Sequence, residues 1–421
     1  MHTRKLELAD IIAAAQNYSD NNNFEEAFIC LWLITTQGPL FSEVRSRIKS
    51  DSVTLRSKAE YYTDFSDVEF LEADKRYNKH PLNTYIETTP LLALWILDRF
   101  LLSRLPMQRN SSQIIEVELA GEQHQYWLYR KDPNRILGRK VTKQYMDALR
   151  FCPGHGVTPR YTSGIEIKIE PLESTTADRL LKFETLDDLK VFYSHFDDAA
   201  MPEKKPDSGD AGKFLFSGLV KEDAREAKLF ETLAAAKDQG AHIVVFPELT
   251  ITPKLRHSIV RWLHEVEDKE HSIIWIVAGS FHEEISDKSG AWINRSYSFG
   301  YEGQIIHKHT KFCSFGKLDD KGYEDIKLWR DIWLVETPLG LVATPICLDF
   351  CNTNSGSPSA NIFSELMVDL CLVPAMDKSD SAHRRQAKDM KRFKGTRTVC
   401  AIQHTLDSKV SLSFDTNLEK F

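Results

Sequence analysis

Apolar residues recur at helical spacing through about the first hundred residues of the chain. The spacing is three or four positions in two early groups, Leu8, Ile11, Ile12, Ala15 and Phe24, Ala27, Phe28, Leu31. Such a period places the apolar side chains on one face of a helix. We therefore predict a mostly helical region over residues 1–105.

Alternation of apolar and polar residues replaces the helical period after residue 114. It runs through residues 115–119 and 165–169, and Gly121-Glu122 marks a turn into the aromatic run at 126–129. Alternation with turn residues between the runs is typical of strands. We therefore predict a mixed α+β domain over residues 1–196. It carries no catalytic or nucleic-acid motif, and a regulatory or partner-binding module is the expectation.

A polar run rich in proline and glycine interrupts these patterns at residues 197–213 and predicts a linker. Beyond it, strand-like and helix-like patterns alternate: apolar residues 214–216, a helical period over 222–238, and the buried-strand pattern 243–246. Alternation of this kind is typical of a layered α/β domain. We predict such a domain over residues 214–421, so that the 421 residues form two domains.

Charge adds little to this picture. The net charge of −7 gives no general attraction to nucleic acid or to an anionic membrane. One basic run, at residues 383–397, stands apart from this balance. We interpret it as the solvated face of a helix, and contact with phosphate or nucleic acid is the alternative.

Several features predict a cytoplasmic protein. Residues 1–5 are not followed by the apolar core of a signal peptide, and the apolar run at 90–97 is too short to cross a bilayer. The seven cysteines have irregular spacings that suit a reducing compartment: Cys30, Cys152, Cys313, Cys347, Cys351, Cys371 and Cys400. None of them has zinc-site spacing, so we expect no metal and no cofactor.

Three apolar, strand-like runs end in chemically active side chains. Glu248 follows residues 243–247, Lys308 follows 305–307, and Cys347 follows 343–346. An acid, an amine and a thiol together suit attack on a weakly electrophilic amide or nitrile carbon, because a thiolate needs a base and the developing oxyanion needs a cation. A lone buried cysteine is usually inert. The ordered set of three therefore indicates a catalytic site.

This ordered set resembles the carbon–nitrogen hydrolase, or nitrilase, superfamily, whose catalytic triad is Glu, Lys and Cys in that chain order. The resemblance covers about residues 214–405. It includes a strand pair with an asparagine, residues 277–280 and 293–296, and a nucleophile strand, residues 340–343. The resemblance implies an αββα sandwich with its catalytic residues at strand ends.

The resemblance also implies a role for each residue. Glu248 would be the base, Cys347 would form a thioester, and Lys308 would stabilise the oxyanion with the N–H that follows Cys347. Lys311 competes with Lys308, and we favour Lys308 because it directly ends its strand. Glu324, between the lysine and the cysteine, is the candidate for positioning substrate, with a solvated loop carboxylate as the alternative.

The resemblance implies thiol-dependent hydrolysis of a small amide, nitrile or carbamoyl compound. The alternative is a nitrilase-like effector or scaffold subunit that binds a ligand or partner, with weak or regulated catalysis. Members of the family usually continue past the segment that matches residues 395–403 with a further strand pair. We therefore expect a sheet shortened at the C-terminus, completed by N-terminal elements or a partner, and a homo-oligomer or protein complex.

Overall fold

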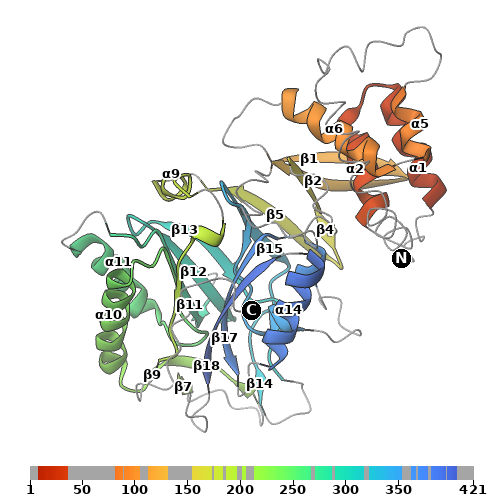
Figure 1. Cartoon of the computed structure of the whole chain (residues 1–421). Helices are drawn as coiled ribbons and strands as arrows, with labels where there is room; N and C mark the ends of the chain where they lie inside the picture. Colours follow the sequence, from red (N-terminus) through yellow and green to blue (C-terminus); the bar gives the residue numbers. More distant parts are fainter. Residues whose placement is uncertain are drawn as a thin grey trace. The chain divides into compact units, whose positions relative to one another are not determined.

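The computed structural model forms two compact units, residues 1–161 and 162–421, and each is described by itself (Figure 1). It describes residues 8–36, 81–88, 90–104, 112–130, 154–172, 175–183, 186–196, 202–204, 213–266, 271–286, 290–316, 322–352, 362–366, 368–377, 381–394 and 396–404.

The first unit packs helices with a small antiparallel sheet. Its helices are α1 (Leu8–Asp20), α2 (Phe24–Thr36), α5 (Pro81–Thr88) and α6 (Pro90–Arg104), and its sheet is β1 (Gln113–Leu119), β2 (Glu122–Arg130) and β3 (His155–Pro159), in that order. The β1–β2 hairpin turns at Ala120 and Gly121, which both have positive φ. Two positive φ values match the right-handed twist of a tight hairpin.

The second unit contains a five-stranded and a six-stranded sheet. The five-stranded sheet has the order β13 (Ile305–Thr310), β12 (Trp292–Gly300), β11 (Trp275–Glu284), β10 (Ile243–Val245) and β6 (Val191–Tyr193). The six-stranded sheet has the order β18 (Arg397–His404), β17 (Leu370–Asp377), β16 (Gly340–Ala343), β15 (Asp331–Thr337), β5 (Ile165–Pro171) and β4 (Tyr161–Thr162).

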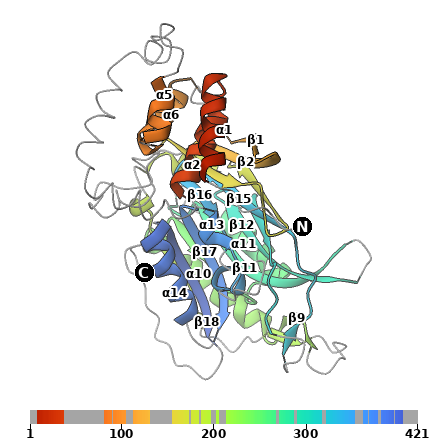
Figure 2. The same cartoon turned by 90° about the vertical axis from the view of Figure 1, so that its right-hand side faces the viewer.

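Helices cover the outer faces of the two sheets, which gives four layers (Figures 1 and 2). On one side lie α10 (Glu222–Asp238) and α11 (Pro253–Glu265), and on the other lies α14 (Ser381–Lys394). Leu229 of α10 and Ile259 of α11 share an apolar core with Phe281 and Phe299 of the five-stranded sheet. This is the αββα arrangement that the resemblance implied.

Short elements complete the second unit. They are α9 (Thr175–Leu180), η1 (Leu186–Asp188), β7 (Pro202–Lys204), β8 (Lys213–Phe214), β9 (Phe216–Leu219), β14 (Tyr323–Glu324), α12 (Leu348–Cys351) and α13 (Ile362–Glu365). Two pairs of them make small sheets, β8 with β14 and β7 with β9. The β8–β14 pair matters for the site, because β14 ends in Glu324.

The boundary between the units differs from the predicted linker at residues 197–213. Strand β5 pairs in parallel with β15, with Glu166 opposite Asp331, and β6 pairs in parallel with β10, with Val191 opposite Ile243. Residues before 197 thus supply one or more strands to each sheet of the second unit. The alternating pattern correctly indicated the strand at 165–169, but a local pattern does not reveal a partner far along the chain.

At the C-terminal end, β18 is the last described strand and an edge of the six-stranded sheet. It pairs in parallel with β17 along its whole length, from Arg397 opposite Leu370 to His404 opposite Asp377. The residues after 404 lie outside the described part of the chain, so the expected shortening of the sheet stays a prediction.

Helix α14 carries most of the predicted basic run. It buries His383, Ala387 and Met390, while Arg384 and Lys388 are exposed. The period of the buried residues is that of an amphipathic helix with one solvated face. This arrangement agrees with the interpretation of the run as the solvated face of a helix.

Two further observations concern location and cysteine chemistry. Among the described residues, helices long and apolar enough to cross a membrane are absent. The six described cysteines are all free thiols, and Cys152 lies outside the described residues.

Candidate functional site

Glu248 stands just beyond the end of β10, where the chain bridges to β11. The residue forms an isolated parallel bridge with Ser280, and the N–H of Leu249 donates to the Ser280 carbonyl at 2.8 Å. Gly279 makes this approach possible. A Cβ at Gly279 would lie 2.1 Å from the Pro247 carbonyl oxygen, and its φ is +57°. The glycine therefore sets the position of the Glu248 backbone.

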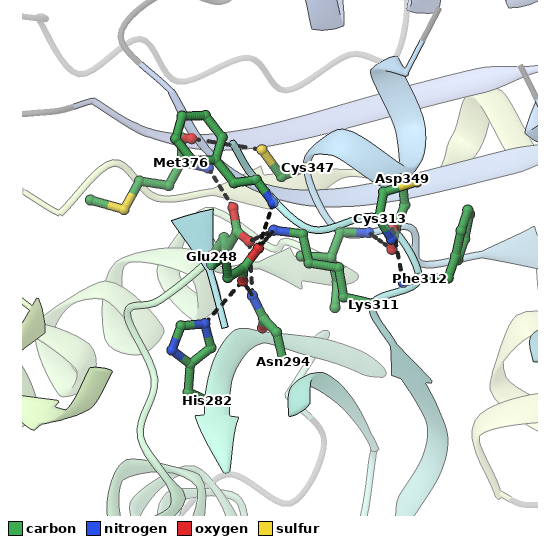
Figure 3. A network of polar contacts seen from close by, with 12 residues as sticks. Glu248, His282, Asn294, Lys311, Phe312, Cys313, Cys347, Asp349 and Met376 are labelled. Atoms are coloured by element: carbon green, nitrogen blue, oxygen red, sulfur yellow. Dashed lines mark hydrogen bonds and ion pairs between the residues drawn. The ribbon is translucent and has the colours of Figure 1, made fainter. Parts of the chain in front are cut away.

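Lys311 is the ammonium that contacts Glu248. Its Nζ donates to Glu248 Oε1 at 2.7 Å and to Glu324 Oε2 at 2.8 Å, and the residue is 1% exposed (Figure 3). Lys311 follows β13 directly, and its backbone N–H donates to the Asn294 carbonyl of β12 at 2.8 Å. The lysine is thus fixed at both its backbone and its side chain between two carboxylates.

Lys308, the lysine favoured from the sequence, lies outside this cluster, because strand alternation turns its side chain away from Glu248. His307, His309 and Lys311 share one face of the β13 segment, and Lys308 is exposed on the other. Its Nζ lies 5.6 Å from the centre of the Tyr297 ring. The strand continues past Lys308 to Thr310, so Lys308 does not end it.

Glu324 is part of the same cluster and is not a solvated loop carboxylate. It is 1% exposed and ends β14. Its Oε1 accepts from His282 Nε2 at 2.9 Å and from Asn294 Nδ2 at 3.0 Å. Its Oε2 accepts from Lys311 Nζ and from the Phe315 N–H at 2.9 Å. All four donors converge on one carboxylate, which orients the lysine.

Two side chains complete the support of the carboxylates. Asn294 Nδ2 donates to Glu248 Oε1 at 2.9 Å and to Glu324, so one amide bridges both. His282 Nδ1 accepts from the Phe216 N–H at 2.9 Å, which leaves Nε2 as the atom that carries the proton toward Glu324. The resemblance indicated the asparagine; nothing in the local sequence indicated His282.

Cys347 lies at a sharp turn after β16, where the sequence predicted a thiol near the end of a strand. Its backbone has φ 46° and ψ −103°, an unusual conformation for a residue other than glycine, and its N–H donates to the Pro374 carbonyl at 2.8 Å. The residue is 6% exposed, and its Sγ lies 3.7 Å from the Met376 carbonyl oxygen (Figure 3). Such strain is often found at functional residues.

Met376 connects the thiol and the base through its backbone. Its N–H donates to Glu248 Oε2 at 3.2 Å, while its carbonyl is the atom close to Cys347 Sγ. The Cys347 thiol also lowers the pKa of the Glu248 carboxyl, in opposition to the effect of burial. Thus the end of β17 places the carboxylate beside the sulfur that it would deprotonate.

Asp349 joins the nucleophile turn to the segment after the lysine. Its Oδ1 accepts from the N–H groups of Phe312 and Cys313 at 3.1 and 2.8 Å (Figure 3). Its Oδ2 accepts from the Ile346 N–H at 3.3 Å and from His309 Nε2 at 3.0 Å. One buried carboxylate therefore fixes Lys311 and Cys347 relative to each other through their neighbouring residues.

The charges in the cluster depend on one another. Burial opposes the charge on Lys311, but Glu248 and Glu324 outweigh it and raise the pKa of the lysine well above its usual value. Burial raises the pKa of Glu248, and Lys311 opposes this rise. Burial acts in the same direction on Glu324, but Lys311 and His282 lower the pKa of Glu324 below its ordinary value.

Burial and the nearby Glu248 carboxylate raise the pKa of Cys347 well above that of a free thiol, and Lys311 only partly offsets them. Cys347 is thus a neutral thiol at rest, and Lys311 is an ammonium. A base that removes the thiol proton only during reaction suits this arrangement better than a permanent thiolate does. Groups of three or more potential metal ligands are absent from the described residues.

Neither the protein-family models nor the curated proteins contain a match to this chain. Similar solved structures include an amidase from Nesterenkonia sp., at 12% identity and TM-score 0.36, with 52% of this chain and 76% of that chain covered. A Saccharomyces cerevisiae member of branch 10 of the nitrilase superfamily matches at 16% identity and TM-score 0.33, with 53% and 78% covered.

A glutamine-dependent NAD+ synthetase from Acinetobacter baumannii matches at 21% identity and TM-score 0.36, with 51% of this chain and 38% of that chain covered. Nitrilase-superfamily amidases and carbon–nitrogen hydrolases are thus among the structural neighbours over about half of the chain, as the sequence resemblance predicted.

Proposed function

We propose that this protein hydrolyses a carbon–nitrogen bond of a small amide, nitrile or carbamoyl compound through a thioester on Cys347. The observation that carries the proposal is the buried contact of Lys311 with both Glu248 and Glu324, linked to the Cys347 thiol through the Met376 backbone. Burial of an ammonium between two carboxylates carries a desolvation cost, and buried charged groups with perturbed pKa values cluster at functional sites. Glu248, Lys311 and Cys347 are the proposed catalytic residues, with Glu324 holding the lysine.

In the first half-reaction with an amide, Glu248 takes the proton of Cys347 as the sulfur attacks the carbonyl carbon. The carbonyl π bond breaks and its electron pair moves to oxygen, where Lys311 and the N–H after Cys347 stabilise the charge. Collapse of this intermediate breaks the C–N bond, and protonated Glu248 returns the proton to the departing amine. The product is a thioester and a free amine.

In the second half-reaction, water attacks the thioester carbon and Glu248 takes a proton from that water. The C–S bond then breaks, the acid product leaves, and the proton returns to the sulfur. Glu248 thus acts as a base and then as an acid in each half, which requires a carboxyl with a pKa above its ordinary value. The direction of the Glu248 pKa shift supports this role.

Alkylation of the intact protein by iodoacetamide, mapped by mass spectrometry, tests the nucleophile. We expect Cys347 to react first among the thiols, and Glu248→Gln to slow its reaction about tenfold or more, because glutamine cannot take the thiol proton as the sulfur attacks. Glu283→Gln is the matched control, because Glu283 is a partly buried carboxylate that pairs with Arg256 and Arg295 instead. Preferential reaction at Cys351 or Cys313 would reject Cys347 as the nucleophile.

Ammonia release from simple primary amides, nitriles and carbamoyl compounds tests the reaction itself. Turnover that is lost in both Cys347→Ala and Lys311→Ala supports hydrolysis. Reactive Cys347 without release from any of these compounds would favour the ligand-binding or scaffold alternative. The cytoplasmic location and the association with other chains stay predictions.

A further inference from the structure

The face of the five-stranded sheet that carries Lys311 and Asn294 remains polar well beyond the catalytic cluster. Strand register arranges its side chains in three rows across β11, β12 and β13. The first row is the catalytic one, with His282 opposite Asn294 and Lys311 beside it. The second row has Ser280 opposite Ser296 and Ser296 opposite His309; the third has Ser298 opposite His307.

These rows lie between the two sheets. His282, Asn294 and Lys311 project toward Glu248 and the end of β17, and His309 of the second row bonds to Asp349 of the nucleophile turn. On the opposite face of the same strands, Phe281 and Phe299 pack with α10 and α11.

Six buried polar atoms on this face have no hydrogen-bond partner among the described residues. They are Asn294 Oδ1, Ser280 Oγ, Ser296 Oγ, Ser298 Oγ, His307 Nδ1 and His307 Nε2. The five residues are each at most 3% exposed. Each of the three rows contains at least one of these atoms, from Asn294 in the first row to His307 in the third.

Unpaired buried polar atoms are rare because each loses its bonds to bulk water. Six of them would remove a large part of the small net stability of a domain. His307 adds to this reasoning, since burial and His309 lower its pKa to about 3. The neutral ring still has one donor and one acceptor nitrogen to satisfy. Ordered water is the usual partner of such groups.

We propose that a file of buried, ordered water molecules leads from Asn294 past Ser280, Ser296 and Ser298 to His307, and that it supplies the water that hydrolyses the Cys347 thioester. The supply role rests on the proposed function. Asn294 is the point of connection, because its Nδ2 holds Glu248 while its Oδ1 is free to accept from the first water. That water lies beside the base that must deprotonate it.

A high-resolution crystal structure of the unmodified protein tests the file directly. We expect water oxygens within hydrogen-bond distance of the hydroxyls of Ser280, Ser296 and Ser298 and of both His307 nitrogens. Serine and histidine side chains that instead bond to protein groups, with no water among them, would overturn the proposal. This measurement does not depend on catalysis.

Acetylation by p-nitrophenyl acetate tests the supply of water. Intact-protein mass spectrometry follows both the formation of acetyl-Cys347 and its hydrolysis. Ser298→Val places two methyl groups in the third row, two rows away from the catalytic side chains. We expect hydrolysis of acetyl-Cys347 to slow about tenfold while its formation changes by less than about twofold, because only the second step consumes water.

Tyr297→Phe is the control, since Tyr297 precedes Ser298 but its hydroxyl bonds to Glu283 on the other face. Ser298→Ala, with the same sign expected, replaces the valine variant if the latter does not fold. Equal slowing of both steps, or unchanged hydrolysis in the serine variants, would refute the supply of water through this file. Absence of acetylation at Cys347 would instead reject the proposed function, while the crystallographic test would still decide the file.

Discussion

Replacement of Lys311 by methionine removes the ammonium that contacts both Glu248 and Glu324, at 2.7 and 2.8 Å. Methionine keeps the length of the side chain, so the change is mainly one of charge. Breaking a buried ion pair by removing one partner costs about 3–5 kcal/mol, because the remaining charge stays buried. For a unit of this size, about 2–4 °C per kcal/mol gives a fall in Tm of about 6–20 °C.

Lys308→Met is the matched control on the same strand. Lys308 is exposed, and its contact with the Tyr297 ring is worth at most about 1 kcal/mol. Scanning calorimetry and denaturant unfolding of both variants measure the difference. A larger loss in Lys308→Met than in Lys311→Met would refute the assignment of the lysine and the electrostatic reasoning with it.

The loss caused by Lys311→Met should depend on pH. Without the ammonium, burial raises the pKa of both carboxyls in the folded variant above their unfolded values. A raised folded pKa favours folding at low pH and disfavours it as pH rises through that pKa. We therefore expect the stability gap between the variant and the unmodified protein to narrow from pH 7 to pH 5. A gap that widens over this interval would contradict the buried-carboxylate explanation.

Three further predictions concern neighbouring features. Asp349→Asn should lower kcat at least about tenfold with little change in KM, because an amide nitrogen cannot accept all four donors that fix the turns of Lys311 and Cys347; an altered KM with unchanged kcat would contradict this. Gly279→Ala should cost about 1–3 kcal/mol in urea unfolding, because its Cβ would meet the Pro247 carbonyl; a neutral effect would show that the Glu248 segment adapts. Light scattering across a concentration series should show an oligomer or larger complex, and a monomer at all concentrations would remove the expected assembly.

The sequence allowed the acid and the thiol to be predicted, because each follows a recognisable apolar strand pattern. It favoured Lys308, whereas the lysine that contacts Glu248 is Lys311. Lys308 and Lys311 differ by three positions, and a six-residue strand with one isoleucine and two polar residues on each face does not show which face is buried. The alternation of His307, His309 and Lys311 was the signal that could have decided it.

The remaining members of the cluster could be predicted only in part. Glu324 was selected by its order in the chain, and Asn294 through the family resemblance. His282 and Asp349 act through contacts with residues 42 and 40 positions away. Neither stands in a local pattern that distinguishes it from an ordinary strand or turn residue. Contacts of this kind depend on how the two sheets are placed, which a periodicity cannot reveal.

The pairing of β5 with β15 and of β6 with β10 has a consequence for how the chain folds. Glu166 pairs with Asp331, which lies 165 residues later in the chain, and much of the site is encoded between them. During synthesis β5 leaves the ribosome long before β15, so β5 has no β15 to pair with until β15 has been made. Native contacts of such high sequence separation slow folding. The backbone N–H and C=O groups of β5 therefore stay unpaired with β15 during translation. We expect this protein to depend on chaperones more than a domain with local strand pairing does.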